Sequence, residues 1–428
     1  MKIPSRLVSS LGVVIAGLNL ATTAQAVSLW VDNVSNPAFL ESRINGINNN
    51  HLSVGSGTLT NFVGAGFWDT SSGGATALPP LFTSASGVPG ACVGGAVSNG
   101  TATTAVIVGS CEDANSIPQG VKWLASSLSS PPQQQQPLPI LAGLRLVPDV
   151  QTEVAAVNLA GVLVGVSISP TGETTPVVWT AAGAANSLLP PLLGSVTNCS
   201  PADISDAATP SIIGNCPAGA GGAGKNQAVL WTNTSSGYSV LPVPSGASYC
   251  VASEINVGGK ILGTCYYLGS GTPDSYKTVQ WAPGGGSAPT VMLTINGSTS
   301  LRNSGVAMNA SGQIAGNRLQ AGGFTTPFFW DPATGTNGIP IAPLPGGSRA
   351  TAKAISDNAV VVGCSETNGA SEAFAYHSVG ATLAAISPLA AGGNDCADAI
   401  SPNGAYTAGT SEDASVSERD DGVITNTP

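Results

Sequence analysis

Short apolar runs alternate with turn residues along the chain, and the same succession recurs about every 50 residues. Each period opens with an aliphatic residue and Asn or Ser, passes through a few turn residues into a short β-branched or apolar run, and closes on Gly. The eight openings are Ile47-Asn48, Val97-Ser98, Val157-Asn158, Ile204-Ser205, Ile255-Asn256, Met308-Asn309, Ile355-Ser356 and Ile400-Ser401. The closing glycines are Gly55, Gly109, Gly165, Gly214, Gly263, Gly316, Gly363 and Gly409. This recurrence predicts a repeat architecture.

Two further marks follow the openings. A stretch with Leu and Pro comes later in the unit, as in Leu241-Pro242-Val243-Pro244. Between the closing glycine and this Leu/Pro stretch, an aromatic residue ends an apolar run. These aromatic residues are Trp68, Trp123, Trp179, Trp231, Trp281, Trp330 and Tyr376. Asn and Gly near the opening suit a tight hairpin, so we read the aromatic run as a third strand and the Leu/Pro stretch as a fourth. Four short strands in about 50 residues, without helical periodicity, predict an all-β propeller.

The two ends of the chain complement each other. The last unit, Ile400 to Gly409, supplies two strands, and the segment with Trp30 carries a third-strand mark without an opening before it. Joining them predicts a blade built from both termini, which pairs otherwise open sheet edges. Seven complete units and one split unit then predict eight blades. The alternative is seven blades, with Trp30 in a leading strand.

Charge and the first residues limit the function. Lys2 and Arg6, an apolar run over 7–20 and the small residues Ala24 and Ala26 together predict a signal peptide over residues 1–26. Its apolar core is too short to span a membrane, and the mature chain contains no membrane span. Only 8% of residues are charged and the net charge is −10, which argues against nucleic acid as a partner. We therefore expect a secreted, periplasmic or cell-surface protein, with a repeat domain over 27–411 and an acidic, disordered tail over 412–428.

The eight cysteines lie in register with the repeat. Three of them precede an opening by five residues and three follow a closing glycine by two, so that each pair is equidistant from a hairpin turn. Residues placed in this way face each other across a ladder. The predicted disulfides are Cys92–Cys111, Cys199–Cys216 and Cys250–Cys265. The two remaining cysteines, Cys364 and Cys396, belong to neighbouring units, so we expect a disulfide between adjacent blades.

Catalytic signatures are sparse. Two histidines, His51 and His377, are too few for a histidine-based zinc site, and neither a Gly-x-Ser-x-Gly elbow nor a Cys-x-x-Cys pair occurs. Four aspartates near turns are read as backbone caps rather than as glycosidase acids: Asp206, Asp357, Asp395 and Asp398. No catalytic, cofactor-binding or metal-binding residue is therefore predicted.

The aromatic residues divide into two groups. The tryptophan series recurs once per unit at the end of an apolar run, which indicates packing between blades. A variable stretch holds better candidates for carbohydrate stacking, namely Tyr266, Tyr267 and Tyr276.

The repeated phrase also resembles a known family. Ala354-Ile355-Ser356-Asp357-Asn358, then Val360-Val361-Val362-Gly363, then Glu372-Ala373-Phe374-Ala375-Tyr376 is similar to the HAF-type extracellular repeat of bacteria over roughly residues 44–411. The histidine of that family is replaced here by Glu372 and Gln227. The resemblance implies export and a propeller-like fold. The family carries no established activity, so it assigns no functional residue.

These observations predict an exported, non-catalytic binding or structural repeat protein. Its ligand would be a glycan, a surface polymer or another protein, and no cofactor is expected. The alternative is a polysaccharide-acting hydrolase or lyase that uses acidic residues on one face of the propeller. Clustered carboxylates with perturbed pKa values on one face would favour the enzyme.

Overall fold

A computed structural model describes residues 31–32, 41–59, 62–69, 74–101, 103–125, 137–140, 148–179, 186–188, 198–218, 225–232, 237–269, 275–299, 302–367, 369–386, 394–412 and 420–428. The predicted signal peptide and Trp30 lie outside these ranges. Within them, no helix is long and apolar enough to cross a membrane.

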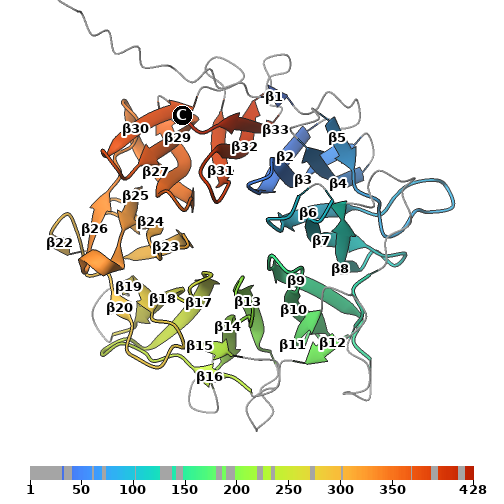
Figure 1. The fold of residues 1–428 in the computed structure, drawn as a ribbon, viewed down its shortest axis with the longest axis horizontal. Coiled ribbons are helices and arrows are strands. Elements are labelled where there is room, and N and C mark those ends of the chain that lie inside the picture. The colour runs from blue at the N-terminus through green and yellow to red at the C-terminus, as the bar shows by residue number, and fades with distance from the viewer. Residues whose placement is uncertain are drawn as a thin grey trace, which may run out of the picture.

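The strands form consecutive antiparallel units around a central axis, in a β-propeller (Figure 1). Unit 1 contains β2 (Glu41–Ile47), β3 (Leu52–Leu59), β4 (Phe62–Asp69) and β5 (Gly74–Ala77). Unit 2 contains β6 (Cys92–Val97), β7 (Val106–Glu112) and β8 (Pro118–Leu124). Unit 3 contains β9 (Gln151–Val157), β10 (Leu163–Ile168), β11 (Thr174–Trp179) and β12 (Asn186–Leu188). Unit 4 contains β13 (Ser200–Ile204), β14 (Ile212–Pro217), β15 (Asn226–Trp231) and β16 (Ser239–Val240).

The second half of the ring continues the pattern. Unit 5 contains β17 (Tyr249–Ile255), β18 (Ile261–Tyr267), β19 (Ser275–Trp281) and β20 (Thr290–Val291). Unit 6 contains β23 (Asn303–Met308), β24 (Ile314–Leu319), β25 (Thr325–Trp330) and β26 (Asn337–Pro340), with the short strands β21 (Thr294–Ile295) and β22 (Ser298–Thr299) and a 3₁₀ turn, η2 (Pro332–Thr334). Unit 7 contains β27 (Gly347–Ile355), β28 (Val360–Thr367), β29 (Ala370–His377) and β30 (Thr382–Ile386). Unit 8 contains β31 (Asp395–Ile400), β32 (Tyr406–Glu412), β33 (Asp420–Asn426) and β1 (Val31–Asp32).

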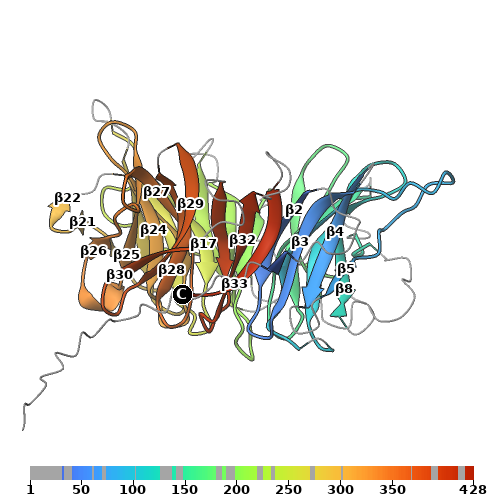
Figure 2. The same ribbon diagram turned by 90° about the horizontal axis from the view of Figure 1, so that it is seen from above.

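Over the described ranges these strands form seven hydrogen-bonded sheets. The expectation of eight separate blades is therefore not met, and the number of sheets agrees with the alternative of seven. The reason is a parallel pairing of β8 with β9, at Gln119 and Thr152, which joins units 2 and 3 into one seven-stranded sheet. Each of these two units keeps its own antiparallel meander inside that sheet. In the side view of Figure 2 the strands run between the two faces of a disc.

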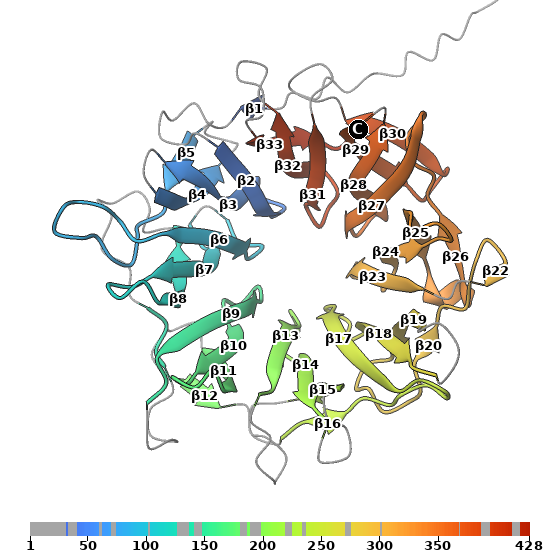
Figure 3. The ribbon, with the colours of Figure 1, turned by 180° about the vertical axis from the view of Figure 1, so that it is seen from behind.

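One sheet contains both ends of the chain, as the sequence predicted. Its strand order is β1-β33-β32-β31, and Val31 and Asp32 pair with Ile424 and Val423 (Figures 1 and 3). The division between the two ends was predicted wrongly: the C-terminal part supplies three strands, and the N-terminal segment supplies the outermost one.

Strand β33 also shows that the prediction for the C-terminal tail was wrong. Residues 412–428 were expected to be disordered because they are acidic, yet Asp420–Asn426 forms β33 and pairs along its length with β32. The β-branched run from Val423 to Thr425 favours a strand. Its pairing surface exists only after β32 is in place.

The repeat has a steric origin. In every unit the first strand contains a β-bulge that skips the residue three positions before the turn Asn or Ser: Asn45, Gly95, Ala155, Ala202, Ser253, Val306, Lys353 and Asp398. Beside each bulge, a first-strand carbonyl presses on the closing glycine of the second strand. A Cβ would collide with that oxygen at Gly55, Gly109, Gly165, Gly214, Gly263, Gly316, Gly363 and Gly409. A side chain is therefore excluded there.

The tryptophans fill the core between units, as predicted for this residue series. Trp123, Trp179, Trp231, Trp281 and Trp330 are among the largest fully buried side chains. Three of them also explain the Leu/Pro mark, because each indole Nε1 donates to a proline carbonyl of the preceding unit. These bonds are Trp123 to Pro79 at 2.9 Å, Trp179 to Pro139 at 3.0 Å and Trp281 to Pro242 at 2.8 Å.

All four predicted disulfides are present. Within units, Cys92–Cys111, Cys199–Cys216 and Cys250–Cys265 have Cα–Cα distances of 4.1, 4.1 and 4.0 Å. Cys364–Cys396 joins β28 of unit 7 to β31 of unit 8, with Cα atoms 4.8 Å apart. The pairing between adjacent units is thereby confirmed.

The closing glycine offers a test of this packing. At Gly263 an added Cβ would meet the Val251 carbonyl and the Trp281 ring, so Gly263→Ala should lower the free energy of unfolding by about 1–3 kcal/mol. Gly286, whose Cβ would meet nothing within 4 Å, is the matched control and should change it by no more than about 0.5 kcal/mol as Gly286→Ala. Denaturant unfolding measures both, and equal stability of the two variants would contradict the steric account.

Candidate functional site

The first turns of the units join their neighbours around the axis. Asn48 Nδ2 donates to the Ser98 carbonyl at 2.9 Å, and Asn256 Nδ2 donates to the Asn309 carbonyl at 3.0 Å. Asp206 accepts from the Leu159 backbone N–H at 2.6 Å. Asp357 likewise accepts from the Ala310 N–H at 2.9 Å, so these two aspartates cap backbone as predicted.

These turns surround a cavity of about 410 Å³, which we call the axial cavity. Residues of all eight units line it, among them Asn49, Asn99, Leu159, Asp206, Val257, Ala310, Asp357 and Pro402. Two further carboxylates, Asp203 and Glu254, also line it. These two residues were not among the candidates predicted from the sequence.

Asp203 and Glu254 occupy the same position in adjacent units, two residues before the turn Asn or Ser. Asp203 Oδ2 accepts from the Ile255 N–H at 2.8 Å, and Glu254 Oε2 accepts from the Met308 N–H at 2.8 Å. Each carboxylate therefore ties its unit to the next. The other six units have Gly or Ala at this position, so a carboxylate in units 4 and 5 departs from the repeat, and this departure could have marked the two residues in the sequence. The small residues are Gly46, Ala96, Ala156, Ala307, Ala354 and Ala399.

Burial perturbs both carboxyl groups. It raises the pKa of Asp203 to about 7; the Asp206 charge adds to this effect, while hydrogen bonds from Ile255 and Ile204 oppose it. Burial also raises the pKa of Glu254 to about 8, with a contribution from the Asp203 charge and an opposing hydrogen bond from Met308. Burial thus shifts both carboxyl groups toward the protonated form relative to exposed carboxyl groups.

Asp395 and Asp398 do not cap turns, in contrast to the expectation; both lie in β31. Asp395 is 2% exposed and stands where units 2, 4 and 5 have their first cysteine. Burial raises the pKa of Asp395 to about 7, and the Glu372 charge adds to the effect. Asp398 is the residue skipped by the bulge of β31.

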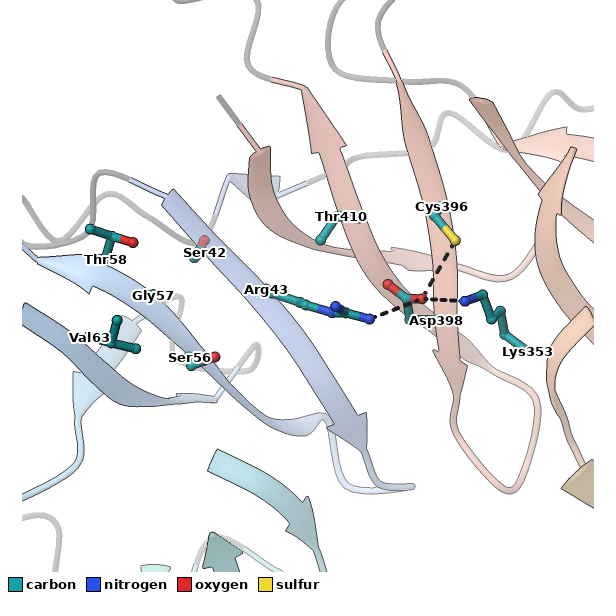
Figure 4. Close-up of a pocket in the computed structure, with 10 residues that line it drawn as sticks. All are labelled: Ser42, Arg43, Ser56, Gly57, Thr58, Val63, Lys353, Cys396, Asp398 and Thr410. Carbon is teal, nitrogen blue, oxygen red and sulfur yellow. Dashed lines mark hydrogen bonds and ion pairs between the residues drawn. The ribbon is translucent and has the colours of Figure 1, made fainter. Parts of the chain in front are cut away.

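Asp398 lies at a second cavity, of about 400 Å³, where unit 8 meets unit 1 (Figure 4). We call it the seam cavity. It is lined by Ser42, Arg43, Ser56, Gly57, Thr58, Val63, Lys353, Cys396, Asp398 and Thr410. The first strands of units 7, 8 and 1 supply its charged residues.

Two cations converge on one carboxylate in this cavity. Arg43 Nη2 and Lys353 Nζ each lie 3.7 Å from Asp398 Oδ1, from opposite sides in Figure 4. The side chains of Arg43 and Lys353 are 60% and 41% exposed, whereas Asp398 is only 12% exposed. Exposed pairs at this distance bind weakly, and two cations exceed one carboxylate by a positive charge. The cations therefore retain capacity for a further anion.

The predicted tyrosines form part of a row in unit 5. Tyr266 stacks on Tyr249 with ring centroids 4.7 Å apart and an interplanar angle of 12°, and lies 6.0 Å from Tyr276. Tyr267 instead lies beneath Lys277 Nζ at 5.4 Å. The structure therefore brings Tyr266 and Tyr276 together, adds Tyr249 and separates Tyr267.

Both histidines contact other parts of the chain. His51 lies 4.1 Å from the Tyr406 ring, and His377 Nε2 lies 2.6 Å from the Pro428 oxygen. Among the residues that the structure describes, no group of three or more His, Cys, Asp or Glu side chains is placed to hold a metal ion.

Comparison with known proteins gives a likeness of fold. No protein-family model matches the chain, and no curated protein matches it. A solved structure described as the Dos1 propeller aligns with a TM-score of 0.50 and 8% identity, over 91% of this chain and 93% of that one. The chain is a β-propeller.

Two other solved structures align less well. The β-propeller domain of the Trilobed protease from Pyrococcus furiosus aligns at TM-score 0.48 and 8% identity, over 79% of this chain and 95% of that one. TolB from Acinetobacter baumannii aligns with a TM-score of 0.37 and 14% identity, over 80% of this chain and 78% of that one. Identities this low carry no activity from one protein to another.

The buried carboxyls predict how stability depends on pH. A carboxyl whose pKa is raised on folding stabilises the protein fully below the unfolded pKa, near 4, and that stability is lost as pH rises through the folded pKa of about 7 to 8. The melting temperature should therefore fall between about pH 5 and pH 8. Asp203→Asn with Glu254→Gln should flatten most of this slope in thermal unfolding, and Asp395→Asn should remove part of the remainder. Glu366→Gln, at an exposed carboxylate, is the control; an unchanged slope in the double variant would contradict the assignment.

Proposed function

We propose that this chain is an exported, non-catalytic binding protein whose seam cavity binds a carbohydrate bearing a carboxylate. The observation that carries the proposal is the convergence of Arg43 and Lys353 on Asp398, at 3.7 Å each, in a cavity of about 400 Å³. That volume is in the range of small-molecule sites.

The chemistry of the lining supports a sugar acid. Arg43 presents a planar fork of donors that matches a carboxylate, and Lys353 adds a point charge. Hydroxyl groups line the same cavity and can both donate to and accept from sugar hydroxyls: Ser56, Thr58 and Thr410. A neutral sugar would leave the excess positive charge unused.

The lining also supports binding rather than hydrolysis. Asp398 is the one carboxylate among the lining residues, and it lies between two cations. Glycoside hydrolysis commonly uses two carboxyl groups that flank the scissile bond.

Export is part of the same proposal. The leader pattern of residues 1–26 and the four disulfides both suit an oxidising compartment outside the cytoplasm. Membership of the HAF-type repeat family is proposed on the repeated phrase of units 1 to 8.

Calorimetry with trigalacturonate tests the binding site, with neutral maltotriose as the matched sugar. The protein should bind trigalacturonate and not maltotriose, and more weakly at high salt. Arg43→Gln or Lys353→Gln should weaken binding by at least about tenfold, because each removes a charge-assisted contact.

Lys260→Gln is the control, since it removes a lysine outside the seam cavity, one whose Nζ donates to the Ser311 carbonyl at 2.7 Å. The affinity of this variant for trigalacturonate should stay within about twofold of that of the parent protein. Equal loss in all three variants, or equal binding of both sugars, would overturn the proposal.

A hydrolase or lyase at the axial cavity is the second candidate. The raised pKa values of Asp203 and Glu254 favour it, because a protonated carboxyl can serve as a general acid. Incubation with polygalacturonate and release of reducing ends or unsaturated products would test it. Turnover lost in Asp203→Asn and Glu254→Gln would establish the enzyme and displace the non-catalytic proposal.

A further inference from the structure

One position links successive units along half of the ring. It follows the closing glycine on the second strand and faces the first strand of the next unit. In unit 4, Asn215 exchanges two hydrogen bonds with the backbone of Ala252, both at 2.9 Å. In unit 6, Asn317 does the same with Ala352, at 3.1 and 2.8 Å.

The same position carries other links in the units between and after these. In unit 5, the Thr264 and Ser304 hydroxyls are hydrogen-bonded at 2.9 Å. In unit 7, Cys364 forms the disulfide with Cys396 of unit 8. Each boundary from unit 4 to unit 8 therefore has a polar or covalent bridge from this position.

The series covers the boundaries from unit 4 to unit 8; the equivalent residues of units 1, 2 and 3 are Ser56, Ser110 and Val166, and no bridge from them is among the described contacts. In unit 8 the position is Thr410, which forms no hydrogen bond with unit 1 among the described contacts and instead lines the seam cavity. The ion pair of Arg43 and Asp398 crosses this boundary there, and Asn403 N donates to Asn49 Oδ1 at 2.7 Å further along the strands. At this boundary the seam cavity thus occupies the place that a side-chain bridge occupies at the four boundaries from unit 4 to unit 8.

The described part of the N-terminal segment pairs with the C-terminal part inside unit 8. The N-terminal strand β1 pairs with β33 through two residues, Val31 and Asp32. The two ends of the chain are therefore held together inside the sheet of unit 8, whose boundary with unit 7 is closed by a disulfide.

We propose that a carboxylated sugar in the seam cavity serves as the missing bridge between units 8 and 1, so that ligand binding and ring closure form one coupled equilibrium. This inference rests on the proposed function. The sugar offers donors and acceptors, as the Asn215 amide does, and its carboxylate meets Arg43 of unit 1 and Lys353 of unit 7. A ligand that contacts both sides of a boundary binds the closed state better, and by linkage stabilises it to the same degree.

Hydrogen exchange of the full chain, with saturating trigalacturonate or with maltotriose, tests the coupling. Trigalacturonate should slow exchange in β31, β32 and β2 by at least about tenfold, with little change in β10 and β11 of unit 3. Maltotriose should change neither region. If trigalacturonate binds in calorimetry but leaves exchange at the seam unchanged, the inference is wrong and the proposed function stands. If it does not bind, both are wrong.

A variant tests the bridge without ligand. Thr410→Asn introduces the residue found at this position in units 4 and 6, and should slow exchange at the seam in the free protein while weakening trigalacturonate binding by at least about tenfold. Ser110→Asn makes the corresponding change in unit 2, outside the seam cavity, and should leave both properties as in the parent protein. Unaltered binding and exchange in a folded Thr410→Asn variant would overturn the inference.

Discussion

The contact between a bulged first strand and a glycine of the second strand is the constraint on which the other features depend. The bulge presses a carbonyl against the glycine Cα, as the Val251 carbonyl does at Gly263. Without a Cβ, the two strands approach closely, and the tryptophan of the third strand packs over the glycine, as Trp281 does there. Because the contact recurs in every unit, the units share one geometry and can form a ring.

The bulge also gives each unit one position at which its chemistry can change. The skipped residue is not constrained by ladder pairing, and a bulge re-aims its side chain. Most units have a small or apolar residue there, whereas units 7 and 8 have Lys353 and Asp398, which meet at 3.7 Å. A fold made of repeated units thereby acquires an ion pair at the seam cavity.

Neighbouring units are joined by contacts that differ in kind but occupy equivalent positions. An asparagine amide, a hydroxyl pair and a disulfide serve successive boundaries at the residue after the closing glycine. Asp203 and Glu254 add a second set, at the cost of placing carboxyl groups where burial favours their protonated form. The stability of the ring is therefore tied both to redox state and to pH.

Features that are local or repeated could be predicted from the amino-acid pattern alone: the strand pattern, the closing glycines, the tryptophan core and all four disulfide pairs, including Cys364–Cys396. The periodicity of the sequence revealed these features because residues at equivalent positions make equivalent contacts in each unit. Tertiary structure decided the rest. It merged units 2 and 3 through Gln119 and Thr152, and turned the acidic tail into β33. It also brought Arg43 to Asp398, residues more than 350 positions apart. Such contacts depend on which strands each end of the chain supplies and on how neighbouring units dock, and no local pattern records either.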